Sequence, residues 1–131
     1  MGSQQLLLII LGMVVIGIMV VIGITLFTNQ AAATNRDAIA NDLVHASSAA
    51  QAYWRRPQIL SGGGKSFVGF DLRWSFRTLS NDNGTYAVVG ALTDSLVTME
   101  GVGHNIGRDS TTPVKVAIRV YPSRIEVQEV N

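Results

Sequence analysis

The sequence predicts an α+β fold in which a long N-terminal helix, about residues 6–56, packs on a small C-terminal antiparallel β-sheet of about four strands. Residues 1–30 carry no charge, and residues 31–56 repeat apolar side chains at helical spacing. Beyond residue 61 the hydrophobic period falls to two. We therefore expect two parts: a hydrophobic helix over 1–30, and an amphipathic helix with a sheet over 31–131.

Length, charge and cysteine content exclude several classes of protein. A chain of 131 residues supports at most one ordinary globular domain, which excludes a multidomain enzyme. Ten Lys and Arg against nine Asp and Glu give a formal net charge of +1, so a dedicated nucleic-acid binder is not expected. There is no cysteine, which leaves no disulfide, thiolate zinc site or cysteine nucleophile.

The first helix has the length of a membrane span. Leu6 to Phe27 is a run of 22 residues in which only Thr25 is polar, and the first charged side chain of the chain is Arg36. A helix of 22 residues is about 33 Å long, against about 30 Å for the hydrocarbon core of a bilayer. No Lys or Arg precedes the run, and it is longer than a cleaved signal requires, so we do not expect cleavage after residue 27.

The helix is predicted to continue to the Arg55-Arg56-Pro57 sequence, because residues 31–56 contain nine alanines and neither glycine nor proline. Proline disfavours helical geometry in the residue before it. One apolar seam steps by 4, 3, 4 and 3 residues and predicts the face that meets the sheet. The seam consists of Ile39, Leu43, Ala46, Ala50 and Tyr53. The polar residues Asn35, Arg36, Asp42, Ser48 and Gln51 are predicted to lie mostly away from it.

Ser61 to Gly64 is predicted to be a flexible break before the sheet. The clearest strand is Val114 to Tyr121, which alternates apolar and polar residues and turns at Pro122-Ser123 into a strand over 124–130. In a two-residue hairpin, facing residue numbers sum to 245. That register pairs Val120 with Ile125, Ile118 with Val127 and Arg119 with Glu126.

Asn83-Gly84 is a turn signal ahead of a second predicted hairpin, with strands over 85–92 and 96–102. Residues 67–72 are a candidate edge strand. Residues 103–113 are polar and contain glycine, which predicts a surface loop.

An uncharged apolar helix, its amphipathic continuation, a glycine-rich connection and a small antiparallel sheet resemble the type IV pilin and pseudopilin superfamily. At the level of sequence the resemblance rests on Gln4-Gln5-Leu6-Leu7-Leu8-Ile9-Ile10 near the start of the helix. Pilins usually carry a glutamate at the fifth mature position, whereas Gln5 stands fifth here. Cleavage after Gly2 would place Leu7 fifth instead. Gln4 and Gln5 are candidate N-terminal contacts that can only hydrogen-bond.

The resemblance implies a structural subunit of a type IV pilus-like filament that polymerises through its apolar helix. An apolar helix stays out of water either in lipid or among copies of itself, and both keep its backbone hydrogen bonds intrahelical. The expected partners are other copies in a helical homopolymer, the inner membrane before assembly and the pilus assembly machinery, with a cell-surface filament as the final location. The candidate assembly core is Leu6, Leu7, Leu8, Ile9, Ile10, Leu11, Val14, Val15, Ile16, Ile18, Val20, Val21, Ile22, Ile24 and Phe27. The alternative is a single-pass anchored envelope protein, a pseudopilin or a secretion or adhesion component, whose sheet binds a partner.

Enzymatic chemistry has no support in the sequence. His45 and His104 lie far apart and lack a metal-binding or catalytic pattern, and no cofactor motif is present. Residues 81–84, Asn-Asp-Asn-Gly, lack the full calcium-loop pattern and are expected to form a plain turn. Asn83-Gly84-Thr85 matches the N-glycosylation pattern, which makes Asn83 a candidate acceptor.

Basic residues gather near aromatic ones in the middle of the chain. Arg55, Arg56, Arg73 and Arg77, with Tyr53, Trp54 and Trp74, are compatible with DNA contact on a fibre, but we favour a solvated face as their explanation. Gly64-Lys65-Ser66 ends like a phosphate loop but lacks its first glycine and its preceding strand, so a linker is expected.

Overall fold

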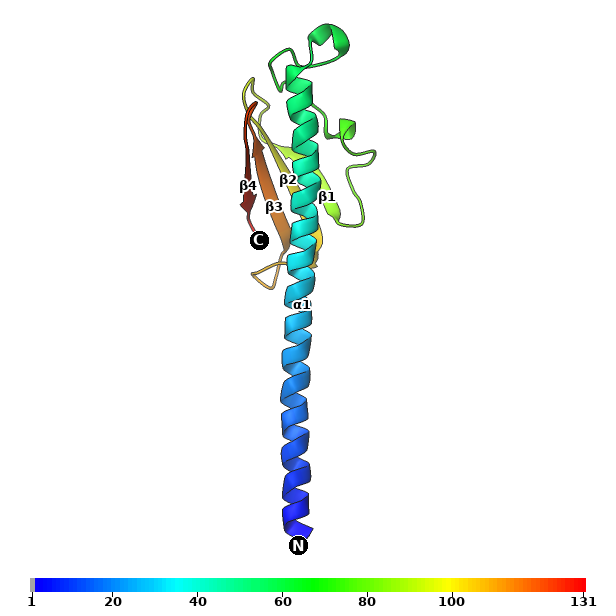
Figure 1. Ribbon diagram of the computed structural model, residues 1–131, viewed down its shortest axis with the longest axis vertical. Coiled ribbons are helices and arrows are strands. Elements are labelled where there is room, and N and C mark those ends of the chain that lie inside the picture. Colours follow the sequence, from blue (N-terminus) through cyan, green and yellow to red (C-terminus); the bar gives the residue numbers. More distant parts are fainter. Residues whose placement is uncertain (1) are drawn as a thin grey trace. The chain divides into compact units, whose positions relative to one another are not determined.

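The computed structural model describes residues 2–131, one long helix followed by an antiparallel sheet (Figure 1). The elements are α1 (Gly2–Arg55), the short 3-10 helices η1 (Gln58–Leu60) and η2 (Leu72–Trp74), and the strands β1 (Gly84–Val89), β2 (Val97–Ile106), β3 (Pro113–Val120) and β4 (Ile125–Glu129). The α+β prediction is confirmed. The chain divides into two compact units, Met1–Ala31 and Ala32–Asn131, and we call the second unit the head.

The head core lies between α1 and one face of the sheet. Ile39, Leu43, Ala46 and Ala50 are completely buried, and Tyr53 is 7% exposed. Side chains alternate between the two faces of a strand, so every second residue of β2 and β3 points at the helix. The strand side chains that are fully buried there are Val97, Met99, Val114, Val116, Ile118 and Val120.

The sheet has the strand order β1-β2-β3-β4, with every neighbouring pair antiparallel. The predicted register of the β3–β4 hairpin is confirmed, since Val120 pairs with Ile125, Arg119 with Glu126 and Ile118 with Val127. The ion pair of Glu126 forms with Arg124, at 3.5 Å. Arg124 lies in the connection that precedes β4.

Two strand boundaries differ from the prediction by more than one residue. The predicted 85–92 strand ends at Val89, because Gly90 has a φ of 75° and turns the chain out of the sheet. β2 continues to Ile106, which pairs with Pro113 after an irregularity in register. The loop predicted over 103–113 is therefore only residues 107–112, and His104 lies on a strand.

The edge strand predicted over 67–72 is wrong. In a strand Phe67 and Phe70 would point to opposite faces, whereas both are buried here together with Leu72. The segment is irregular because its side chains gather beside the helix end, where the Phe70 ring centroid lies 5.7 Å from that of Tyr53.

The flexible break predicted at Ser61–Gly64 is also wrong, because these residues fold back and cap α1. The backbone N–H of Gly63 donates to the Tyr53 carbonyl at 2.8 Å, and that of Gly64 to the Arg56 carbonyl at 2.9 Å. The final carbonyls of a helix have no partner inside it, so this turn supplies donors. A side chain on Gly63 would collide with the Ser66 carbonyl, which explains the glycine.

Glycines in β2 allow α1 to approach the sheet closely. A Cβ atom at position 101 would overlap Cγ2 of Ile39 and lie 3.0 Å from the Tyr86 ring. A Cβ atom at position 103 would overlap the Asn35 side-chain oxygen. The helix and β2 therefore pack with almost no space between backbone and side chain.

We predict that Gly101→Ala lowers the free energy of unfolding of the head by about 1–3 kcal/mol through overpacking. Ile39→Ala costs about 2–5 kcal/mol by itself, but it removes the colliding atom. The double variant is expected to lose at least about 0.5 kcal/mol less than the sum of the single losses. Denaturant unfolding in detergent can be followed by tryptophan fluorescence, because the chain's two tryptophans, Trp54 and Trp74, lie in the head. If the losses in unfolding free energy of the two single variants simply add in the double variant, the close contact between positions 101 and 39 is contradicted.

Candidate assembly surface

The apolar first half of α1 is exposed along its length. All fifteen predicted core residues have exposed side chains, from 42% at Val15 to 75% at Phe27. Gln4 and Gln5 are exposed as well. Contiguous exposed apolar patches on soluble monomers rarely exceed a few hundred Å², and larger ones mark a contact with a membrane or a protein. This segment therefore requires an apolar environment from outside the single chain.

By length and composition, α1 can cross a membrane. A core helix of a soluble protein would pass the same test while being mostly buried, but the apolar window of α1 is entirely unburied. The few hydroxyls nearby are satisfied within the helix. Thr25 donates to the Val21 carbonyl at 2.9 Å, and Thr28 donates to the Thr25 carbonyl at 3.0 Å. Hydroxyls paired in this way suit an environment without water.

Several polar residues predicted to lie away from the seam instead hold the second half of α1 to the loops and termini of the sheet. Arg36 is only 7% exposed and donates to the Asn131 backbone oxygen at 2.8 Å. Asn35 donates to the Asn83 carbonyl at 2.8 Å, and Gln51 donates to the Tyr121 carbonyl at 3.0 Å. These side chains border the seam and are long enough to reach the loops at the sheet ends. Ser48 is exposed, as predicted.

Asp42 is the centre of a polar cluster between α1 and the turn before β1. One of its carboxylate oxygens accepts hydrogen bonds from the Asn81 amide at 3.0 Å, the Asn83 amide at 2.9 Å and the Tyr86 hydroxyl. Burial opposes ionisation of this carboxyl, but the three hydrogen bonds and the nearby His45 together lower the pKa of Asp42. Burial and the hydrogen bond to Asp42 raise the pKa of Tyr86. The cluster therefore links a helix carboxylate to the sheet, and no sequence motif indicated it.

The Asn83 amide nitrogen, to which a glycan would be attached, is one of these donors to Asp42. The predicted plain turn over 81–84 is present, because the Asn81 side-chain oxygen accepts the backbone N–H groups of Asn83 and Gly84 at 2.9 and 3.1 Å. Glycosylation of Asn83 would attach the glycan to an amide nitrogen that lies 2.9 Å from the Asp42 carboxylate. Asn83 thus acts as a structural residue in this conformation.

The remaining candidate sites are dispersed. His45 is exposed on α1, and His104 on β2 has a ring nitrogen 3.3 Å from the Asn81 carbonyl. Within residues 2–131 no group of three His, Cys, Asp or Glu side chains could hold a metal ion. In the candidate DNA patch, Tyr53 is buried with its ring centroid 5.0 Å from that of Trp74, while its hydroxyl donates to the Val68 carbonyl. Tyr53 is therefore part of the core and is not available to stack on a base.

Comparison with known proteins finds no matching family model, curated protein or solved structure. The resemblance to type IV pilins accordingly rests on the order of elements and on the residues near the start of α1.

We predict that Asp42→Asn lowers the free energy of unfolding at pH 7 by about 1–3 kcal/mol, because the variant amide loses the charge that strengthens a part-buried group of three hydrogen bonds. Asp37→Asn, at an exposed position of α1, is the matched control and is expected to change it by less than about 0.5 kcal/mol. Denaturant titrations as a function of pH measure both effects.

The pKa of Asp42 is lower in the folded head than its ordinary value of 3.8, so its stabilising contribution is present above pH 3.8. That contribution is lost as the pH falls through the lower pKa of the folded state. The difference in free energy of unfolding between the wild-type protein and Asp42→Asn should therefore become smaller in acid. A gap of constant size from pH 7 to pH 2 would contradict the assignment.

Proposed function

We propose that this protein is a structural subunit of a type IV pilus-like filament, held in the inner membrane by α1 before assembly and polymerised through residues 6–27 afterwards. The observation that carries the proposal is the exposure of the fifteen predicted core side chains on the part of α1 that precedes Arg36 and carries no charged side chain. Lipid and a bundle of identical helices both cover such a surface and leave its backbone hydrogen bonds intact. Moving from one to the other exposes no apolar surface to water.

The amphipathic half of α1 also supports a polymer. A helix that only served as a stalk would need a solvated surface, but residues 31–56 include nine alanines. Ala32, Ala46 and Ala50 are buried in the core of the head, and the other six let neighbouring helices approach closely. The head, in turn, needs no catalytic centre to serve as the outer layer of a fibre. Its polar side chains stabilise its own fold.

The direct test is electron microscopy of material sheared from cells that produce the chain, combined with mass spectrometry of the fibres. Fibres that contain this chain support the filament. Exclusively membrane-bound monomers, with no polymer in the sheared material, would instead favour an anchored envelope protein whose head binds a partner.

We predict that Val15→Asp or Ile16→Asp reduces fibre yield at least tenfold, because a charge at the centre of an apolar helix costs about 2.5–3.5 kcal/mol even by membrane-insertion scales. Val15→Leu is the matched control and should assemble normally. Both positions lie in the Met1–Ala31 unit, so tryptophan fluorescence and unfolding of the head should not change. Normal fibre yield from either aspartate variant would contradict assembly through this segment.

A further inference from the structure

The head exposes an apolar projection at the end of α1. The side chains of Ile59 and Leu60, in η1, are 95% and 64% exposed, and we call this pair the knob. Figure 1 shows η1 in green beyond the end of α1. An exposed leucine or isoleucine by itself needs no explanation, but two adjacent ones on an ordered, hydrogen-bonded turn present a fixed apolar surface.

The knob lies in the most basic part of the chain. Residues 55–77 hold five of the ten basic residues and one of the nine acidic ones, so this segment has a net charge of +4 and the rest of the chain −3. Arg55, Arg56 and Lys65 flank the knob. Within residues 2–131, none of the three forms an ion pair. The knob therefore favours an apolar partner with an acidic rim.

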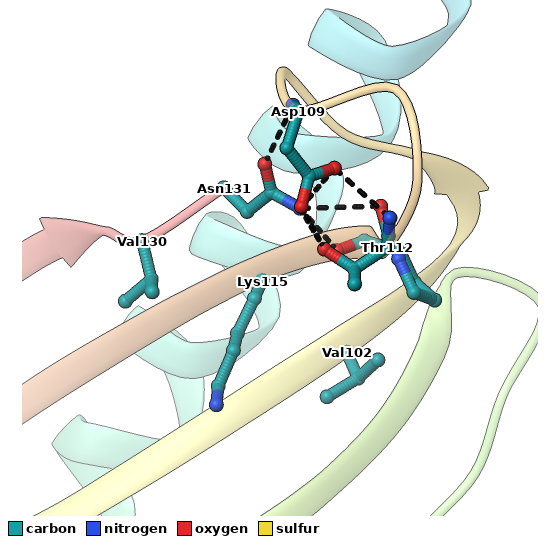
Figure 2. A pocket seen from close by; sticks show the side chains of 7 residues that line it. Val102, Asp109, Thr112, Lys115, Val130 and Asn131 are labelled. Carbon is teal, nitrogen blue, oxygen red and sulfur yellow. Dashed lines mark hydrogen bonds between the residues drawn. The ribbon is translucent and has the colours of Figure 1, made fainter.

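A pocket with these properties lies on the outer face of the sheet, which α1 does not cover (Figure 2). It has a volume of about 500 Å³, and its apolar lining consists of Val102, Pro113 and Val130. A volume in the range of about 300–1,000 Å³ is typical of sites that enclose small apolar groups. The pocket is therefore large enough for one or two aliphatic side chains.

Two charged side chains, Asp109 and Lys115, line the pocket. Hydrogen bonds from the Thr112 hydroxyl and two backbone N–H groups hold the pKa of Asp109 well below the usual range, so it is charged at neutral pH. Lys115 pairs with Glu100 at 2.8 Å, whereas Asp109 forms no ion pair within residues 2–131. The Asp109 carboxylate is therefore the lining charge that can meet the basic surroundings of the knob.

The knob and the pocket lie at opposite ends of the head. The pocket residue Asn131 accepts a hydrogen bond from Arg36, whereas the knob follows the end of α1 at Arg55. About 19 residues of helix separate Arg36 from Arg55, which corresponds to about 29 Å. The two surfaces of one chain therefore cannot meet each other, and each needs a second molecule.

We propose that the knob of one copy inserts into the pocket of a second copy, with Ile59 and Leu60 against Val102, Pro113 and Val130. This inference rests on the proposed filament function and adds a head-to-head contact to the helix core. Two different surfaces at opposite ends of a unit form a heterologous contact, which repeats without limit unless the rotation closes a ring. The contact therefore has the symmetry that an open polymer requires.

Because the chain has no cysteine, the contact can be tested by site-specific cross-linking of the full chain. Ile59→Cys combined with Val130→Cys, treated with a short bismaleimide in sheared fibres and in detergent micelles, should give a ladder of linked copies. The matched control combines Ile59→Cys with Val89→Cys, which is 42% exposed on the same face of the sheet but does not line the pocket. We expect at least tenfold more linked product from the first pair. Cross-linking a mixture of the single variants Ile59→Cys and Val130→Cys should give dimers and no larger products, because each copy then carries one cysteine.

The outcomes separate this contact from the filament itself. Fibres with a ladder support both, and fibres without a ladder overturn the knob contact alone. A ladder in micelles without any fibres supports the contact and overturns the filament, whereas the absence of both overturns both. If the ladder is missing and Ile59→Glu abolishes binding of the full chain to double-stranded DNA, the knob binds nucleic acid and the proposal is wrong.

Discussion

The exclusion of water from the first half of α1 is the constraint on which the rest of this protein depends. Each large apolar side chain moved out of water contributes roughly 1.5–3 kcal/mol, so the fifteen exposed residues together represent tens of kcal/mol. Within residues 2–131 the structure leaves them exposed. By length and composition α1 can cross a membrane, which would supply the apolar environment that they lack. The head, a separate compact unit, must fold without help from this segment. Its own hydrophobic core allows it to do so.

The second half of α1 packs on the sheet of the head through two kinds of contact. The apolar seam supplies most of the buried surface, but hydrophobic contact is not directional and does not by itself define where the helix lies along the strands. Polar contacts at the two ends, from Arg36 to Asn131 and from Gln51 to Tyr121, define that position. The glycines of β2 then allow the helix to lie close to the sheet. Any force transmitted along α1 would thus reach the sheet through both kinds of contact.

The uneven charge of the head provides a further physical asymmetry. A symmetric dimer would use one self-complementary patch, which a strongly basic surface resists through repulsion of like charges. Arg55, Arg56 and Lys65 give the knob such basic surroundings, while at the pocket Lys115 pairs with Glu100 and Asp109 forms no ion pair within residues 2–131. This distribution favours head-to-tail contacts over two-fold pairing.

The linear pattern of residues was sufficient for the α+β class, the seam of α1 and the register of the β3–β4 hairpin, because each depends on a short periodicity or on one turn. It failed where contacts between distant segments decide the conformation. Phe67 and Phe70 match a strand locally, but the space beside Tyr53 draws both to one side. The glycines at 62–64 suggest flexibility, yet they are required where the chain folds back on the helix end. Only the tertiary structure brings Asp42 together with Asn81, Asn83 and Tyr86, and places the knob and the pocket at opposite ends of the head, because such arrangements depend on how separate elements pack and leave no periodic trace along the chain.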